Sequence, residues 1–320
     1  MHRSCVTLLF AASLIAQTGN LTAYPQDTTQ NSAASFTPFG VDIFGSLAES
    51  HAQMLVPAAY LPGPGALLTG LSVQCQTVAA VNYASLQITL SPTTAGALSP
   101  TFANNLTAPQ VVLAATGLVV NFNHQWTQIP FTTPYVHDGT SALVVDVQKV
   151  AAAPFQAAIM STVTRADLPL SVYDFGPPGS GASTSTMAMS QGSGAIVLRL
   201  EWLGAPTMRL RSDPAASGNA FAVGGRIDDT VNGTPGSLYL NMIGVALQAA
   251  PLPPVLGLFR VNGVTIDVGT LDAAGTSVRS IPIPNHPGLV GNYFTFQAIT
   301  LDAVAMLPQF TNAADCFIAN

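Results

Sequence analysis

The stretch that decides the fold of this chain runs from Gln125 to Val150 and reads QWTQIPFTTPYVHDGTSALVVDVQKV. From Leu143 to Gln148 the side chains alternate with a period of two, which predicts a strand with one buried face. Asp138 and Gly139 precede this strand and predict a hairpin turn, because glycine tolerates the positive φ that tight primed turns need. Strand, turn and strand around Trp126 predict the core of a β-sandwich.

Similar short runs recur along the chain and are separated by Gly, Pro and Asn. In the first part we expect strands at 52–56, 67–76, 85–90, 110–115, 125–131, 142–150, 156–163 and 195–203. In the second part we expect strands at 220–223, 237–247, 255–261, 265–268, 277–283, 292–301 and 315–319. Many short strands with such punctuation are typical of sandwiches and jelly rolls.

The alternation is clearest in the last strand of the first part. Four large apolar side chains are expected to face the core, while the residues between them face outward. The core-facing residues are Ile196, Leu198, Leu200 and Trp202, and the outward-facing ones are Val197, Arg199 and Glu201.

A boundary is expected near Gly204 and Pro206. We therefore predict a signal peptide at 1–23, a disordered leader at 24–36, a jelly-roll-like β-sandwich at 37–204 and a smaller Ig-like β-sandwich at 205–320. The fold class is thus all-β, with two tandem antiparallel sandwiches. The Gly-, Ser- and Thr-rich stretch at 179–194 predicts a long mobile loop in the first sandwich.

The N-terminus has the pattern of a secretory signal peptide. Basic Arg3 is followed by an apolar run from Val6 to Ala16 and then by polar residues. Cleavage is expected after Ala16 or, as a second choice, after Ala23. No later segment has the run of apolar residues that a membrane helix needs, so we expect no membrane insertion after cleavage. The expected location is secreted, extracellular or at the cell surface.

Charged residues make up only 8% of the 320 residues, whereas soluble domains typically contain about 25%. The net charge is −6, and the basic residues are scattered. A nucleic-acid partner is therefore not expected, because such proteins carry a clustered basic surface.

Signal cleavage would remove Cys5 and leave Cys75 and Cys316. An even pair in an exported protein is compatible with a disulfide. Cys75, however, continues the alternation of Leu71 and Val73, which places it on a core face as a small apolar residue. We favour two buried thiols over a bridge.

A likeness to a known group of proteins rests on short strand and turn motifs. In the first part they are Gln53–Leu55, Pro64-Gly65, Leu71–Val73, Ser85–Leu90, Thr101–Asn105, Trp126, Pro130-Phe131, Pro134-Tyr135 and Asp138-Gly139. In the second part they are Ser280–Asn285, Pro287–Gly291, Phe296–Ala298, Leu301-Asp302 and Thr311–Ala314. The chain resembles secreted tandem β-sandwich proteins of planctomycete-type bacteria. The resemblance implies the fold and export, and it implies no enzymatic activity and no site residues.

Histidine and serine motifs give little indication of catalysis. The histidines of the mature chain stand singly, without the spacings typical of metal ligands. They are His51, His124, His137 and His286, and we expect His51 on the solvated face of a strand and His137 and His286 in turns. The segment from Gly192 to Gly194 lacks the strand-to-helix context of a serine hydrolase elbow.

A glycosidase would need two carboxylates across a sugar. Glu49 and Glu201 are the only glutamates, and Asp146 and Asp174 could join them. Glu201 is the best single candidate for a hydrolase, but its ordinary interpretation is an exposed charge on a strand.

Two weaker kinds of site remain. Asp228 and Asp229, with Asn232, supply oxygen atoms of the kind that binds calcium, although a polar turn explains them equally well. Exposed aromatic side chains stack on sugars, and the candidates are Tyr60, Tyr83, Tyr135 and Tyr173, with Trp126 expected to pack in the core.

The sequence therefore predicts a non-catalytic, structural or adhesive protein outside the cell. Its expected partners are a glycan, the extracellular matrix or neighbouring surface proteins. The alternative is a carbohydrate-binding module, and the third hypothesis is a secreted hydrolase on a sandwich scaffold. No cofactor is expected beyond a structural calcium ion.

Overall fold

The computed structural model describes residues 19–24, 33–35, 38–62, 65–123, 126–164, 171–192, 194–196, 198–203, 205–212 and 221–319. Strands account for 61% of the described residues and form several antiparallel sheets, which confirms the all-β prediction. The helices in this part of the chain are single 3-10 turns: η1 (Ala58–Tyr60), η2 (Phe102–Asn105), η3 (Ala182–Thr184) and η4 (Pro287–Leu289). Not one of the described helices has the length and apolar character needed to cross a membrane.

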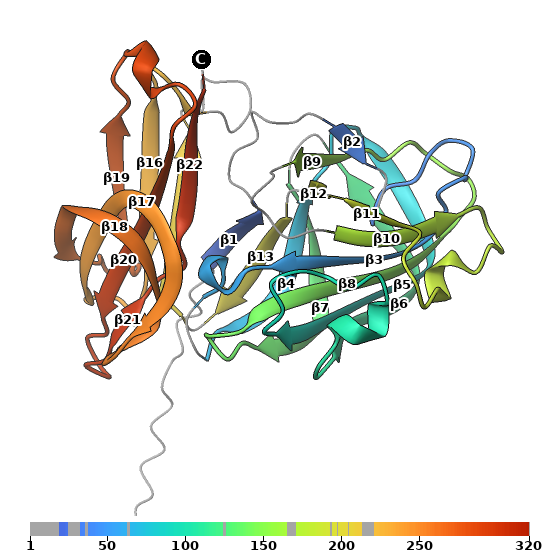
Figure 1. Cartoon of the computed structure of the whole chain (residues 1–320), viewed down its shortest axis with the longest axis horizontal. Helices are drawn as coiled ribbons and strands as arrows, with labels where there is room; N and C mark the ends of the chain where they lie inside the picture. Colours follow the sequence, from blue (N-terminus) through green and yellow to red (C-terminus); the bar gives the residue numbers. More distant parts are fainter. Residues whose placement is uncertain are drawn as a thin grey trace, which may run out of the picture.

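The first half of the chain forms two large sheets and a small one, all antiparallel (Figure 1). The four-stranded sheet has the order β1 (Gly19–Tyr24), β13 (Leu198–Leu203), β4 (Leu67–Gln74), β7 (Trp126–Val136). The six-stranded sheet has the order β11 (Ser190–Gly192), β10 (Ser171–Gly176), β3 (Glu49–Val56), β8 (Ala142–Ala152), β5 (Ala79–Thr93), β6 (Gln110–Phe122). The small sheet has the order β12 (Gly194–Ile196), β9 (Met160–Thr164), β2 (Ala33–Ser35).

The largest hydrophobic cluster is formed by apolar side chains of the two large sheets. Leu71 and Leu200 of the four-stranded sheet belong to it together with Ile88 and Val145 of the six-stranded sheet. The alternation predicted for the last strand is confirmed where side chains are described. Ile196, Leu198, Leu200 and Trp202 are buried, whereas Arg199 and Glu201 are only partly buried.

Two predictions about the deciding stretch are wrong. Both faces of β8 are buried, not one, because a second apolar cluster covers Val144 on the outer face of the sheet with Leu98 and Phe102. The turn at Asp138-Gly139 has the expected positive φ at the glycine, but it does not close a hairpin. Instead β7 belongs to the four-stranded sheet and β8 to the six-stranded sheet, so the turn carries the chain between layers.

The second half of the chain forms one three-stranded and one six-stranded sheet. The first has the order β14 (Thr207–Ser212), β16 (Arg226–Asn232), β19 (Thr276–Pro282). The second has the order β15 (Phe221–Ala222), β22 (Ala314–Ala319), β20 (Tyr293–Leu301), β17 (Leu238–Leu252), β18 (Val255–Thr270), β21 (Pro308–Phe310). Its pairings are antiparallel except for the short contacts of β15 with β22 and of β18 with β21.

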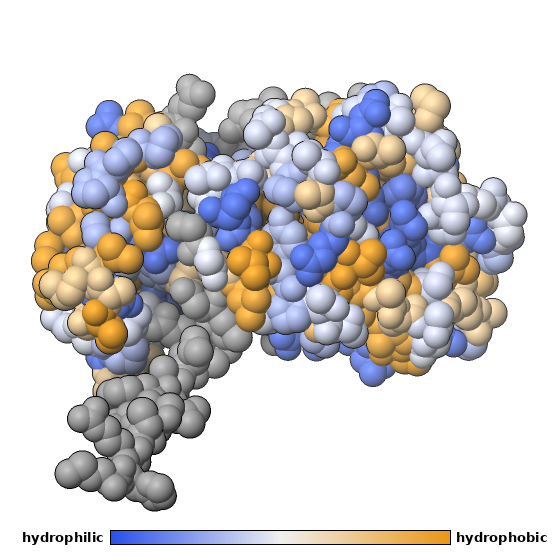
Figure 2. Space-filling view, turned by 90° about the horizontal axis from the view of Figure 1, so that it is seen from below, coloured by the Kyte–Doolittle hydropathy of each residue, from blue (hydrophilic) through white to orange (hydrophobic). Residues whose placement is uncertain are grey.

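A separate hydrophobic cluster fills this second half, with Ile227 and Met208 from the smaller sheet and Phe296 and Cys316 from the larger one. The outer strands of the larger sheet leave several apolar side chains exposed, among them Val264 and Val268. In the face of the molecule shown in Figure 2, apolar side chains lie interspersed among polar ones.

The two halves lie side by side and share a buried polar contact (Figure 1). The Tyr60 hydroxyl donates a hydrogen bond to Asp315, and Arg260 Nη2 lies 3.1 Å from the same hydroxyl. The Arg260 guanidinium also stacks 4.4 Å from the centre of the Tyr60 ring and 3.7 Å from an oxygen of Asp315.

Cys75 and Cys316 are buried and are not joined by a disulfide, as favoured from the sequence. Cys75 belongs to the hydrophobic cluster of the first half and Cys316 to that of the second. A bridge between them would require two separate cores to merge.

Candidate functional site

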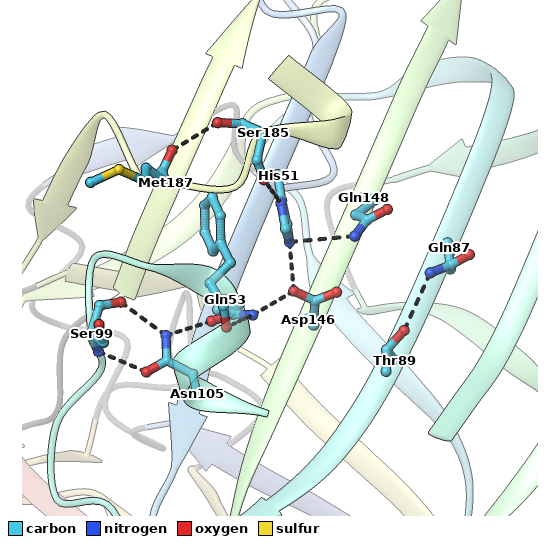
Figure 3. Close-up of polar contacts among 11 residues, drawn as sticks. His51, Gln53, Gln87, Thr89, Ser99, Asn105, Asp146, Gln148, Ser185 and Met187 are labelled. Atoms are coloured by element: carbon cyan, nitrogen blue, oxygen red, sulfur yellow. Dashed lines mark hydrogen bonds and ion pairs between the residues drawn. The ribbon is translucent and has the colours of Figure 1, made fainter. Parts of the chain in front are cut away.

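The densest polar arrangement in the described chain lies on the outer face of the first six-stranded sheet (Figure 3). It begins as two rows of polar side chains that cross β3, β8 and β5 in register. His51, Gln148 and Gln87 form one row, and Gln53, Asp146 and Thr89 form the next. Residues of one row point to the same side because side chains alternate along each strand.

The centre of this arrangement is a buried His51–Asp146 pair. His51 Nε2 lies 2.7 Å from Asp146 Oδ1, and His51 Nδ1 lies 2.8 Å from the backbone oxygen of Ser185. Both ring nitrogens of His51 therefore have a hydrogen-bond partner. The ring stacks on Phe102 at 3.7 Å, which closes it off from solvent. The geometry is that of a buried, directly hydrogen-bonded imidazole and carboxyl pair.

Two amide side chains extend the pair into a network beneath the 98–106 segment. Gln53 Nε2 donates to Asp146 Oδ1 at 2.7 Å and lies 3.1 Å from the backbone oxygen of Phe102. Asn105 donates to Gln53 Oε1 at 2.7 Å and exchanges two further bonds with the backbone of Ser99. The network therefore fixes the segment that covers the sheet, which is a structural role.

A second carboxylate holds the stretch at 179–194, which the sequence led us to expect as a mobile loop. Glu49 accepts hydrogen bonds from the backbone N–H groups of Gly179 at 2.6 Å and Gly181 at 2.9 Å, and from the hydroxyl of Ser180 at 3.3 Å. The stretch also contains η3 and β11. The prediction of one long loop is wrong to the extent that η3 and β11 interrupt it, and the buried carboxylate accounts for the local order because it needs these donors.

A groove of about 320 Å³ opens beside the covered network, on the same face of the sheet. Its polar lining consists of neutral amides and hydroxyls, including Gln87 and Gln148 of the first row and Ser183 and Thr184 of η3. His51 and Asp146 do not line it. The groove can therefore form hydrogen bonds with a neutral ligand, and the His51–Asp146 pair does not face it.

The aromatic candidates for sugar stacking are mostly not exposed, so this expectation is wrong for Tyr60, Tyr83 and Tyr135. Tyr83 is completely buried, its hydroxyl donates to the backbone oxygen of Phe39, and burial raises its pKa. Tyr135 packs in the first core, and Tyr60 forms the contact with Asp315. Only Tyr173 of the four is partly exposed, stacked on Phe175 with the ring centres 6.1 Å apart.

Trp126 was expected in the core, but it is only partly buried, with Arg199 stacked 3.8 Å from its ring centre. The tryptophan buried in the core is Trp202.

The calcium candidates are not brought together. Asp228 and Asp229 are consecutive residues of β16 and point to opposite faces. Asp228 pairs with Arg226 at 3.2 Å, and Asn232 bonds to the hydroxyls of Thr207 and Thr276. Within the part of the chain that the structure describes, there is no cluster of three or more His, Cys, Asp or Glu side chains that could hold a metal ion.

Asp229 is the buried member of this group. It accepts a hydrogen bond from Asn241 at 2.7 Å. Burial raises the pKa of its carboxyl group from 3.8 to about 6, and the hydrogen bond from Asn241 and the charge of Arg279 oppose this shift.

Glu201 and the remaining histidines have structural partners. Glu201 accepts from Ser72 at 2.6 Å and from Gln128, so it is not the free strand charge that we expected. His137 accepts from the backbone N–H of Gly139 at 2.9 Å in its turn, and burial lowers its pKa. His286 caps η4. His124 and Ser193 lie outside the described residues.

Sequence reasoning missed the His51–Asp146 pair, since it placed His51 on a solvated face. Alternation along each strand correctly indicates which residues share a face. It does not determine the register in which β3 and β8 pair, and this register places Gln53 opposite Asp146.

No protein-family model matches the chain, and no curated protein matches its sequence.

Proposed function

We propose that the protein is an exported, non-catalytic β-sandwich protein with a structural or adhesive role. In this proposal the first half is a jelly-roll-like sandwich and the second a smaller Ig-like sandwich, and the two work outside the cell as one stiff scaffold. The observation that carries the proposal is the engagement of the reactive side chains. Glu49, His51 and Asp146 hold covering segments in place, and the groove beside them is lined by neutral groups.

Catalysis by these groups would require a different arrangement. A general acid or base must reach the reacting atom of a bound substrate. His51 has both ring nitrogens engaged and a ring face covered by Phe102. Glu201 is engaged by two donors on the other large sheet. A hydrolase therefore has less support than a scaffold.

The proposal of export rests on the signal-like N-terminus, and it predicts where the signal peptide is cleaved. Strand β1 pairs with β13 from Gly19 to Tyr24. Cleavage after Ala16 keeps this strand, whereas cleavage after Ala23 removes nearly all of it. We expect N-terminal sequencing of the protein released by a secreting host to read from Gln17. Retention of Met1, or a start at Tyr24, would contradict the proposed processing.

A carbohydrate-binding role is the second candidate, and the lining of the groove favours it. Amides and hydroxyls exchange hydrogen bonds with sugar hydroxyls, and the volume is at the small end of the range for ligand sites. No carboxylate or basic group lines the groove. The ligand is therefore expected to be a neutral saccharide rather than an acidic one.

A glycan array probed with the mature protein tests this role. We expect neutral glycans to bind, and Gln87→Ala and Gln148→Ala each to weaken binding by about tenfold, the equivalent of one hydrogen bond. Asn262→Ala, on exposed β18 of the other half, is the matched control and is expected to bind as the wild type does. Binding that is unaffected by both glutamine variants would place the ligand elsewhere, and failure of every glycan would leave the scaffold role as the proposal.

A further inference from the structure

The sandwich of the first half is open along one side, where two consecutive strands lie next to each other in different sheets. Strand β6 is the last strand of the six-stranded sheet, and β7 is the last strand of the four-stranded sheet. Among the described strands, each of them has a ladder partner on one side only, β5 for β6 and β4 for β7. The two facing edges therefore present rows of backbone N–H and C=O groups toward the opening.

One end of this opening is held together by side chains. Gln110 Nε2 donates to the backbone oxygen of Pro134 at 2.9 Å, and the Thr132 hydroxyl donates to the backbone oxygen of Val112 at 3.1 Å. These contacts take the place of a backbone ladder near residues 110–112. They fix the spacing between the two edges and leave the stretch from Leu113 to Asn121 facing the opening.

A cleft of about 490 Å³ occupies that stretch. Its walls are mostly apolar and contain no charged side chain. Leu113, Val120 and Ile129 line it and also belong to the hydrophobic core, so the cleft reaches the core itself. Val119 at its rim is 53% exposed.

One buried polar atom in the cleft has no hydrogen-bond partner among the residues that the structure describes. Thr127 lines the cleft, and its hydroxyl is buried without a hydrogen bond. A buried hydroxyl without a partner costs free energy, so such groups in folded proteins ordinarily find one. A ligand with its own hydrogen-bonding groups would satisfy this hydroxyl, whereas a purely hydrocarbon ligand would not.

We propose that the cleft between β6 and β7 is an acceptor site for an extended, uncharged peptide segment of another polypeptide, which adds a strand to the open side of the sandwich. The occupant follows from the chemistry of the walls. Two facing strand edges require alternate N–H and C=O groups along the ligand, which an extended backbone supplies. The uncharged apolar floor requires apolar side chains at every second position. This cleft shares only Ala115 with the lining of the proposed glycan groove, and its peptide ligand differs from a glycan, so the two proposals fail independently.

The test uses the full mature protein and an array of uncharged peptides with apolar residues at alternate positions, each as long as the segment from Leu113 to Asn121. We expect peptides of this class to bind. We also expect amide hydrogen exchange to slow in β6 and β7 and to stay unchanged in β18. Binding by no peptide of the array would overturn the proposal.

Two controls separate strand addition from simple capture of an apolar molecule. Methylation of alternate backbone nitrogens of the best peptide removes the donors on one edge but keeps its side chains, and we expect at least tenfold weaker binding. Val119→Arg places a charge at the rim of the cleft, at a residue that does not line the glycan groove, and is expected to abolish binding. Val111→Arg, at an exposed residue of the same strand that lines neither the cleft nor the groove, is expected to leave binding unchanged. Equal binding of the methylated peptide, or binding that survives Val119→Arg, would overturn the proposal.

Discussion

Lys149 is the only lysine of the chain, and it is completely buried at the core-facing side of β8. Its ammonium donates to the backbone oxygen of Gly40. Burial lowers its pKa from 10.5 to about 7, and the carboxylate of Asp42 offsets only part of this shift. Replacement by methionine, which has a similar length and no charge, therefore removes a strongly pH-dependent contribution to stability.

The direction of this pH dependence follows from the number of protons that Lys149 binds in the folded and unfolded states. Between pH 7 and pH 10.5 the unfolded lysine is protonated and the folded one is largely neutral, so stability rises with pH in this window and is lost as pH falls toward 7. Between pH 7 and pH 9.5 the gain amounts to about 3 kcal/mol, at about 1.4 kcal/mol for each pH unit over most of the interval. A change of this size is a large fraction of the stability of an ordinary domain.

Denaturant unfolding of the wild type and of Lys149→Met across this pH window checks the prediction. We expect the free energy of unfolding of the wild type to rise with pH and that of the variant to be nearly level. Gln148→Met, on the same strand but facing the groove, is the matched control and should follow the wild type. Parallel profiles for wild type and Lys149→Met would refute the reasoning, because the lysine would then keep its proton in the folded state.

Three further outcomes are expected. Asp229→Asn should stabilise the protein at pH 7.5 much more than at pH 4, because a carboxyl group with a folded pKa of about 6 loses about 2 kcal/mol of stability as pH rises from 4 to 7.5. Denaturant midpoints at the two pH values measure this difference. Leu200→Ala should lower the free energy of unfolding by about 2–5 kcal/mol, because Leu200 is buried in the core. Arg199→Ala, on the outward face, should lower it by about 1 kcal/mol through the lost stacking on Trp126. Equal losses in thermal unfolding would contradict the assigned faces. Tyr60→Phe should lower the free energy of unfolding by about 1–3 kcal/mol, because Asp315 and Arg260 lose their hydrogen bonds to the Tyr60 hydroxyl. Calorimetry measures this loss and shows whether the two halves then unfold in separate transitions.

The parts of the fold that could be predicted from the sequence are those that depend on local alternation. The inward faces of β13 and of Leu71, Val73 and Cys75 followed directly from a period of two. The hairpin at Asp138-Gly139 did not, because the same turn residues serve a connection within a sheet and a connection between sheets. Which of the two occurs depends on where β7 and β8 find partners, and those partners are distant in sequence.

The candidate site depended still more on distant pairing. Gln53 and Asp146 meet because β3 and β8 pair in one particular register, and Asn105 joins them from a covering segment. Burial of Tyr83 likewise required knowledge of what lies over β5. Residue type alone identified polar and aromatic groups, but it could not say which of them tertiary packing would enclose.

The position of Lys149 has a practical result for chemical work with this protein. Because its ε-amine is enclosed and no other lysine exists, an amine-reactive label added to the native protein should attach only at the α-amino group. Coupling to a solid support through amines would then orient every molecule alike. Labelling of the Lys149 ε-amine would then occur only when the fold opens around it. The fraction of labelled protein, measured by mass spectrometry over time, would give the rate of this opening.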